Sequence, residues 1–421
     1  MRIAMLSYHT CPLAILGGKD TGGMNVYVRE LTRFLGQAGI HVDVFTRSQD
    51  EHVPHILHDL GYGNRVVHIP AGPEHPLPKN ELACHIPVFT AEVLRFAEQK
   101  GLRYDLIHSH YWMSGVAGAG LKQAWQVPMV QMFHTLSAVK NRIARGHEAE
   151  GAYRALGEQQ AINAADRIVA ATPAEVEQLR AHYQVDPDRL VVIPPGVDLS
   201  HFYPIPPDEA RAAIDIPADA RMLLFVGRIE PLKGVDTLLR ALARMREDCA
   251  RDLCPYHLAI IGGDLEDQPS QSDSELARLK DLCHQLGLDD MVVFLGKRDQ
   301  TTLPYYYSAA LCLVMPSFYE SFGMVALESM ACGTPVVTSN AGGLAYLVQN
   351  GETGFTVPSG DVPALADTLT RLLLDDELRQ KIGVQAAAYA RNYAWENIAR
   401  RIMDLYQELL PPTVDGMCQR F

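Results

Sequence analysis

The chain has no excess of positive charge. It carries 37 Lys and Arg residues against 50 Asp and Glu residues, which gives a formal net charge of -13. Proteins that bind the phosphate backbone of nucleic acids need a basic surface, so this charge argues against a DNA- or RNA-binding function. An anionic ligand would have to be bound by a local group of cations.

Cysteine motifs and long apolar segments are also missing. The 8 cysteines are scattered and form no Cys-x-x-Cys pair, which argues against a zinc site and a disulfide framework. No window approaches the length of a membrane-spanning helix, and the N-terminus leads into a predicted strand without the apolar stretch of a signal peptide. We therefore expect a cytoplasmic protein that does not span a membrane.

The sequence contains neither internal repeats nor low-complexity segments. Short β-rich runs instead alternate with amphipathic helical stretches along the whole chain, which is typical of βαβ units and parallel sheets in an α/β protein. Strands are predicted at 2–8, 42–46, 66–70, 106–110, 129–134, 167–172 and 190–193 in the first half, and at 222–226, 257–261, 291–295, 311–315, 335–338 and 354–357 in the second.

A proline-rich segment separates the two halves. With 421 residues the chain is too long for one compact core, so two domains of similar size are expected. The prolines of Pro194–Pro207 disfavour both a helix and a central strand, and we place the boundary there. This divides the chain into residues 1–197 and 198–395, followed by a final helix in 396–421 that is expected to pack back on the first domain.

Glu320 and Glu328 are candidate ligand-binding carboxylates. They stand eight residues apart in Glu-Ser-Phe-Gly-Met-Val-Ala-Leu-Glu, whose glycine and small residues indicate a strand end, a tight loop and a helix start. This arrangement would set both carboxylates at the mouth of a parallel sheet, where ligands of open α/β folds bind. Two solvated carboxylates on a helix surface are the alternative, which is weaker because Glu320 precedes Gly323 in a loop and Glu328 falls in an apolar helical run.

Two further segments follow predicted strands and could bind an anion. Gly22 and Gly23 precede an amphipathic helix, where glycine lets the backbone approach a ligand and free N–H groups favour an anion. Their spacing differs from the Gly-x-Gly-x-x-Gly of dinucleotide-dependent oxidoreductases.

Arg228 follows the strand at 222–226 and Lys233 precedes the next helix, so both cations could converge on one diphosphate. Solvated basic side chains are the usual alternative.

These residues together resemble the retaining GT-B glycosyltransferases of family four, over nearly the whole chain. Five segments match in order: Gly-Gly-Met-Asn-Val-Tyr-Val-Arg-Glu-Leu, His-Ser-His-Tyr-Trp, Phe-His-Thr-Leu, Val-Gly-Arg-Ile-Glu-Pro-Leu-Lys-Gly and Glu-Ser-Phe-Gly-Met-Val-Ala-Leu-Glu. The combination is specific, whereas each segment alone is not. The resemblance implies two Rossmann-like, doubly wound domains facing a cleft that closes on its substrates, with the acceptor on the first domain and the nucleotide sugar on the second.

For the donor, the resemblance implies a UDP-sugar whose diphosphate is bound by Arg228 and Lys233. Glu320 would bind hydroxyls of the donor sugar and Glu328 those of the ribose, while Arg298 would lie beside the base. Gly23 would approach the donor as well as the acceptor.

No metal or other cofactor is expected, because two fixed cations can relieve the charge on the departing diphosphate. The segment Asp186-Pro-Asp188 is interpreted as a polar turn rather than a metal site.

His134 is the candidate for direct participation in the reaction. It closes the predicted strand at 129–134, at a family position that lies against the donor sugar and the leaving phosphate. The family is thought to retain configuration by front-face attack, with the leaving phosphate oxygen taking the acceptor's proton, so no enzyme nucleophile is required. We therefore expect a transition-state hydrogen bond from His134 rather than general-base catalysis, although a lone histidine is more often structural.

The acceptor is expected to carry a phosphate, because two or three cations with hydroxyl donors make a suitable phosphate site. Two relatives, the sucrose-phosphate synthases and the inositol-phosphate N-acetylglucosaminyltransferases, bind this phosphate at positions matched here. The matching residues are Lys79, Tyr111, Thr135, Lys140 and Arg154, and Gly23 and Asn25 are further acceptor-binding candidates.

The sequence is divided between these two relatives. Met24 stands where sucrose enzymes commonly carry Gln, which favours the inositol-phosphate enzymes. Those enzymes, however, are confined to one bacterial lineage whose proteins are typically rich in Ala and Arg. The Gln, His, Lys and Tyr usage of this chain does not resemble that composition, which favours a sucrose-phosphate synthase. Fructose 6-phosphate with UDP-glucose, giving sucrose 6-phosphate, is the first choice. UDP-N-acetylglucosamine with inositol phosphate is the alternative, followed by a phosphatidylinositol mannosyltransferase-like peripheral membrane enzyme, a UDP-sugar epimerase and a non-catalytic sugar-nucleotide-binding module.

Overall fold

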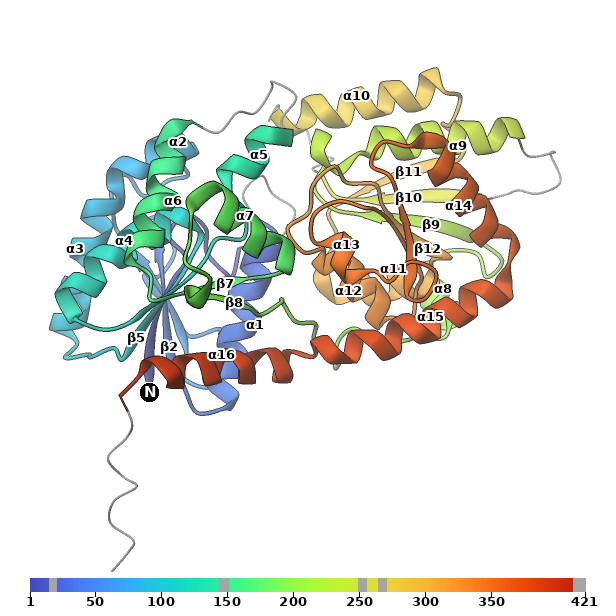
Figure 1. Ribbon diagram of the computed structural model, residues 1–421. Helices are drawn as coiled ribbons and strands as arrows, with labels where there is room; N and C mark the ends of the chain where they lie inside the picture. The colour runs from blue at the N-terminus through green and yellow to red at the C-terminus, as the bar shows by residue number, and fades with distance from the viewer. Residues whose placement is uncertain (15–20, 144–150, 249–255, 264–270, 412–421) are drawn as a thin grey trace, which may run out of the picture. The chain divides into compact units, whose positions relative to one another are not determined.

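The computed structural model describes residues 1–14, 21–143, 151–248, 256–263 and 271–411 of the chain (Figure 1). These residues form two compact units, of which the first comprises Met1–Ala14, Met24–Pro194 and the segment from Trp395 onward. The second comprises Pro195–Ala394 together with the segment that ends at Gly23. The chain thus changes unit within the proline-rich segment, slightly before the predicted boundary at residue 197.

Unit 1 is built on an 8-stranded sheet in the order β3-β4-β2-β1-β5-β6-β7-β8. All neighbouring strands are parallel except β3, which runs antiparallel to β4. In sheet order the strands are β3 (Ile56–Leu57), β4 (Arg65–Ile69), β2 (His41–Arg47), β1 (Arg2–Leu6), β5 (Leu106–His110), β6 (Met129–Met132), β7 (Arg167–Ala170) and β8 (Leu190–Val192).

The helices of unit 1 cover its sheet, and three of them, α3, α4 and α6, pack together. The set consists of α1 (Gly23–Gln37), α2 (Lys79–Leu82), α3 (Ile86–Gln99), α4 (Tyr111–Trp125), α5 (Ser137–Ile143), α6 (Ala152–Ala164), α7 (Pro173–Tyr183) and α16 (Trp395–Leu409).

The last helix, α16, belongs to unit 1 although it follows unit 2 in the sequence (Figure 1). Trp395 packs edge-to-face on Tyr27 of α1 with ring centroids 5.3 Å apart. Farther along the helix, the hydroxyl of Tyr406 lies 2.6 Å from Nδ1 of His108 on β5. These contacts place Trp395 in unit 1 rather than at the end of the second domain, where the sequence had assigned it.

Unit 2 is a doubly wound sheet of six parallel strands in the order β11-β10-β9-β12-β13-β14. Helices α9, α10 and α14 pack together, as do α8, α11, α12 and α15, and the two groups cover opposite faces of the sheet (Figure 1). The strands are β11 (Val292–Gly296), β10 (Tyr256–Ile261), β9 (Arg221–Val226), β12 (Cys312–Met315), β13 (Val336–Ser339) and β14 (Gly354–Val357). The helices are α8 (Pro207–Ala213), α9 (Val235–Asp248), α10 (Gln271–Gln285), α11 (Leu303–Ala309), α12 (Met324–Ala331), α13 (Leu344–Leu347), α14 (Val362–Leu374) and α15 (Asp376–Ala390).

Both sheets confirm the predicted α/β class, and each contains a topological switch point. In unit 1 the chain winds outward from β1 through β2 to β4 and then resumes on the other side of β1 with β5. In unit 2 it winds from β9 to β11 and resumes with β12 beside β9. Ligands of open α/β sheets bind at the carboxyl ends of the strands flanking such a point. These are the ends of β1 and β5 in unit 1, and of β9 and β12 in unit 2.

Every predicted strand is present, and its ends lie within two residues of the predicted ones. The antiparallel strand β3 was not predicted, because its two residues are too few to show an alternating pattern.

Candidate functional site

In unit 2, the segments that follow β9 and β12 are joined at the carboxyl edge of the sheet. The backbone N–H of Phe318 donates to the carbonyl of Leu232 at 2.8 Å. Lys233 and Glu320, one from each segment, form an ion pair in which 15% of each side chain is exposed. The structure therefore brings two of the predicted donor-binding residues into direct contact at the switch point of this sheet.

Arg228 lies in the segment after β9 but pairs with a different carboxylate. Its Nη1 lies 2.7 Å from Oε1 of Glu230. The predicted glycine pair is close by within unit 2: a Cβ built on Gly22 would lie 4.0 Å from Nε of Arg228, and one on Gly23 would lie 3.3 Å from the sulfur of Met324. Backbone and guanidinium are thus arranged where an anion could contact both.

Glu328 on α12 and Arg298 after β11 both contact helix α11. The hydroxyl of Tyr307 donates to Oε2 of Glu328 at 2.8 Å, and Nε of Arg298 donates to the hydroxyl of Tyr306 at 3.1 Å. Burial and the charge of Glu328 raise the pKa of Tyr307 well above its usual range, so Tyr307 remains a hydrogen-bond donor. Glu328 is therefore held in a fixed orientation, whereas Arg298 is exposed.

In unit 1, Tyr111 and His134 follow the adjacent strands β5 and β6. Both have left-handed backbone conformations, with φ of 73° at Tyr111 and 61° at His134. A non-glycine residue in this region costs on the order of 1–3 kcal/mol and is typically found where the surroundings enforce it, often at a functional site. Two such residues at the carboxyl ends of neighbouring strands point to a binding site at this edge of the sheet.

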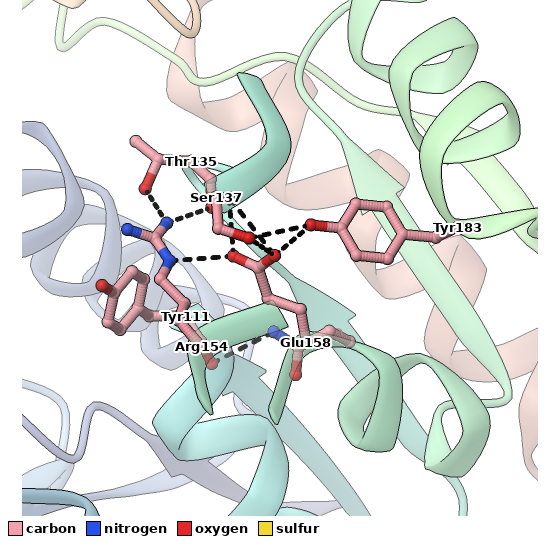
Figure 2. A network of polar contacts seen from close by, with 7 residues as sticks. Tyr111, Thr135, Ser137, Arg154, Glu158 and Tyr183 are labelled. Carbon is pink, nitrogen blue, oxygen red and sulfur yellow. Dashed lines mark hydrogen bonds and ion pairs between the residues drawn. The ribbon is translucent and has the colours of Figure 1, made fainter. Parts of the chain in front are cut away.

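Arg154 of α6 contacts both Thr135 and Tyr111 (Figure 2). Its Nη2 donates to the carbonyl oxygen of Thr135 at 3.0 Å and to the Thr135 hydroxyl at 2.9 Å. The guanidinium carbon lies 5.0 Å from the centre of the Tyr111 ring. Three of the predicted acceptor-binding residues therefore form one cluster, and Arg154 is only 1% exposed.

Glu158, which was not predicted, binds Arg154 of this cluster together with Ser137 and Tyr183 (Figure 2). Its carboxylate is fully buried and accepts from Nε of Arg154 at 2.9 Å. It also accepts from the backbone N–H of Ser137 at 2.9 Å, from the Ser137 hydroxyl at 2.6 Å and from the Tyr183 hydroxyl. Because Ser137 begins α5, Glu158 fixes both the arginine and the helix that carries Lys140.

Lys79 lies on a separate element, at the start of α2. The loop that precedes it is held by Arg47, a buried residue at the end of β2. The guanidinium of Arg47 donates to the carbonyls of Pro73 at 2.5 Å and His75 at 2.6 Å. The position of Lys79 is thus set by a buried cation that binds backbone oxygens.

Asn25 is buried on α1 and binds the loop after β1. Its amide donates to the hydroxyl of Thr10 at 2.7 Å and to the carbonyl of Cys11 at 2.8 Å. In this arrangement both amide protons serve the fold, so an acceptor role for Asn25 would have to use its side-chain oxygen or a rearranged loop.

Burial keeps His134 neutral by lowering its pKa to about 3. A neutral imidazole can donate one hydrogen bond and accept another, whereas it supplies no positive charge. This state suits the hydrogen-bonding role predicted for His134.

Asp186 and Asp188 form the expected turn. The Asp186 carboxylate accepts from the backbone N–H of Asp188 at 3.1 Å and caps a short 3-10 helix. Among the residues that the structure describes, no group of three or more His, Cys, Asp or Glu side chains is arranged to hold a metal ion. Within the same ranges, no helix is long and apolar enough to cross a membrane.

Sequence reasoning missed Glu158, Tyr307 and Glu230. Arg154 and Glu158 have i, i+4 spacing, which usually indicates an exposed helical pair, and Tyr307 lies in a helix with no polar pattern. Glu230 stands two residues after Arg228, which was the one local signal for its contact.

Two family descriptions match this chain, one for each half. "Glycosyltransferase Family 4" matches residues 21–201 and "Glycosyl transferases group 1" matches residues 207–389. The D-inositol 3-phosphate glycosyltransferase of Acidothermus cellulolyticus is 42% identical over 422 aligned residues, which cover 100% of this chain and 93% of the relative. The protein of the same name from Corynebacterium efficiens is 38% identical, with 99% of this chain and 97% of the relative covered.

Among solved structures, the sucrose-phosphate synthase of Thermosynechococcus elongatus has the same fold. The two chains superpose with a TM-score of 0.89 at 35% sequence identity, over 97% of this chain and 98% of the synthase. The resemblance inferred from the five sequence segments is thereby confirmed. This chain belongs to glycosyltransferase family 4 and is a retaining hexosyltransferase with the GT-B fold.

Proposed function

We propose that this enzyme transfers N-acetylglucosamine from UDP-N-acetylglucosamine to an inositol phosphate, with retention of configuration. The observation that carries the proposal is the 42% identity to a D-inositol 3-phosphate glycosyltransferase along the whole chain. The first choice from the sequence was fructose 6-phosphate, and the comparisons support the alternative better. Met24, which departs from the Gln common in sucrose enzymes, agrees with the inositol-phosphate acceptor.

In the proposed donor site, Arg228 and Lys233 bind the diphosphate. Both cations are already paired with carboxylates, Arg228 with Glu230 and Lys233 with Glu320. An ammonium has three donors and a guanidinium five, so each cation can turn a donor toward phosphate oxygens while retaining part of its ion pair. Glu320 would then be close enough to the diphosphate to bind hydroxyls of the attached sugar.

The nucleoside would be bound farther along unit 2. Tyr307 fixes the orientation of the Glu328 carboxylate, which we assign to the ribose hydroxyls. Arg298 stays a candidate for the neighbourhood of the base.

In the proposed acceptor site, Arg154, Thr135 and Tyr111 bind the phosphate of the acceptor. The charge of Arg154 is balanced by Glu158, so this cluster alone supplies geometry rather than net positive charge. Lys79 and Lys140 would add the charge that a phosphate dianion requires.

The chemistry requires no nucleophile from the protein. The bond between the anomeric carbon and the diphosphate oxygen breaks, the acceptor hydroxyl oxygen bonds to the anomeric carbon, and its proton passes to the departing phosphate. Arg228 and Lys233 stabilise the charge that develops on the diphosphate, and His134 donates a hydrogen bond to the leaving group.

A sucrose-phosphate synthase is the second candidate, because a structure of that name superposes with a TM-score of 0.89. UDP release and product formation should be measured with UDP-glucose and UDP-N-acetylglucosamine, each against D-inositol 3-phosphate and fructose 6-phosphate. Unphosphorylated inositol and fructose serve as matched controls. Turnover that is greatest with UDP-N-acetylglucosamine and inositol phosphate is expected. Preference for fructose 6-phosphate would refute the proposal, and turnover without any acceptor would indicate an epimerase or hydrolase.

A further inference from the structure

Two more histidines lie behind His134 in unit 1. His108 and His110 are fully buried residues of β5. The ring of His110 is surrounded by three aromatic rings, with centroids 4.3 Å away at His108, 5.3 Å at His134 and 5.5 Å at Tyr27. Strands buried in a parallel sheet are usually apolar, so polar rings at these positions call for an explanation beyond packing.

Within the described part of the chain, the imidazole of His110 makes one hydrogen bond, and its partner is His134. Nδ1 of His110 lies 3.1 Å from Nε2 of His134. Burial lowers the pKa of both rings far below neutrality, so each carries a single N–H. One ring must therefore donate and the other accept.

The remaining nitrogen of His110 decides which ring donates. Nε2 of His110 is buried and has no hydrogen-bond partner among the residues that the structure describes. If His134 were the donor, His110 would carry its proton on Nε2, as a buried N–H with nothing to receive it. If His110 donates from Nδ1, the unpartnered atom is only a bare acceptor. Orphaned buried N–H groups are rarer than under-satisfied acceptors, so the second arrangement is favoured.

We propose that His110 is a positioning residue that fixes His134 in the tautomer with its proton on Nδ1. The Nδ1–H of His110 donates to Nε2 of His134, so the proton of His134 is on Nδ1, where it can be donated to the ligand. His134 is the less buried residue of the pair, and the left-handed φ values at Tyr111 and His134 set the backbone on both sides of the contact. The inference rests on the proposed role of His134 and adds how its donor is selected.

A histidine whose tautomer is set by a second group is an established device of catalytic sites. Here the second group is itself a buried imidazole. Its other neighbours are Tyr27 and His108, and the latter is bound by Tyr406 at 2.6 Å.

The tautomer can be measured directly by NMR of the full chain labelled with ¹⁵N-histidine, without any substrate. We expect the two-bond couplings of His134 to show a proton on Nδ1 in the wild type. His110→Asn keeps an amide donor near the place of Nδ1 and should preserve this tautomer. His110→Phe removes the donor and should allow the Nε2–H form. A wild-type His134 protonated on Nε2 would overturn the proposal.

Kinetics with any acceptor that the enzyme glycosylates provide the second test. His110→Phe should lower kcat at least about tenfold, as expected for one lost transition-state hydrogen bond, while KM for the nucleotide sugar stays within about twofold. His110→Asn should recover most of kcat. An unchanged kcat in His110→Phe would refute the inference.

Two further variants keep the test decisive. If His110→Phe does not fold, His110→Gln replaces it, because its longer side chain carries the amide away from the position of Nδ1. His134→Phe tests the underlying function separately: full activity in that variant would refute the catalytic role of His134 whatever the tautomer measurement shows.

Discussion

The buried pair of Arg154 and Glu158 offers a stringent test of the acceptor cluster. The two side chains are 1% and 0% exposed and lie 2.9 Å apart. Glu158→Gln has nearly the same shape and retains one acceptor oxygen for Arg154 and Ser137. Its new amide group can donate to the hydroxyl oxygens of Ser137 and Tyr183. The substitution therefore removes mainly the buried negative charge that Nε of Arg154 faces at 2.9 Å.

The expected cost is large for a single substitution. Breaking a buried ion pair by removing one partner typically destabilises a protein by about 3–5 kcal/mol. For a folding unit of 150–250 residues this corresponds to a decrease in Tm of roughly 6–20 °C, at about 2–4 °C per kcal/mol. Arg154→Met should cost a similar amount, because it leaves the carboxylate of Glu158 unpaired.

The double variant Glu158→Gln/Arg154→Met shows whether the two single variants lose stability because they break one ion pair or for unrelated reasons. Replacing both charges is often close to neutral, so the double variant should be more stable than either single one, a strong coupling in a double-mutant cycle. Glu177→Gln on α7 is the matched control, since its pair with Arg180 leaves 70% of the glutamate exposed and should change stability by less than about 1 kcal/mol. Thermal unfolding followed by calorimetry is the assay. A Glu158→Gln variant within about 2 °C of the wild type would refute the reasoning.

Other predictions concern the donor site, metal dependence and pH. Arg228→Ala and Lys233→Ala should each lower kcat/KM by about 10- to 100-fold, because each removes charge-assisted bonds worth about 1.5–3 kcal/mol; activity within a few-fold of wild type would disprove the diphosphate assignment. Glu230→Gln should lower KM for the donor a few-fold by releasing Arg228 from its carboxylate, and an increased KM would contradict this role. Full activity is expected in excess EDTA, and its abolition would establish a metal requirement. Burial raises the pKa of Glu175 to about 7, above its value in the unfolded chain. The stability that the protonated carboxyl contributes is therefore present below about pH 4.5 and lost as the pH rises through 7. Thermal unfolding of Glu175→Gln, followed over this pH range, should lack the corresponding decrease in Tm.

The sequence contained enough information to predict the fold because the strands are buried on both faces. Such strands read as short apolar runs bounded by turn residues, and the intervening helices show a 3.6-residue period. The candidate donor-binding residues of unit 2 could also be chosen from the sequence, because Arg228, Lys233 and Glu320 follow strands and stand among glycines and prolines. Charged residues in such segments are rarely placed by packing alone, so their position indicates a ligand.

The supporting residues could not be predicted, because tertiary contacts alone define them. Glu158 binds Ser137, which is 21 residues away, and Tyr183, which is 25 residues away. Its one local partner, Arg154, has the spacing of an ordinary surface pair. His110 likewise meets His134 only because β5 and β6 are neighbours in the sheet. Pairings of this kind depend on strand order, which residue periodicity does not contain.

The two half-sites balance their cations in different ways, and this difference bears on affinity. Arg154 is paired with a carboxylate that is fully buried and held by Ser137 and Tyr183, so an acceptor phosphate cannot displace it. Lys233 is paired with Glu320, whose side chain is 15% exposed and can turn toward a sugar hydroxyl when a diphosphate arrives. In the proposed sites, the donor therefore competes with an internal anion for its cation, whereas the acceptor meets a rigid, neutralised arginine. Salt should consequently affect donor binding through this exchange of partners. Selection of the acceptor should depend on the fixed geometry around Arg154.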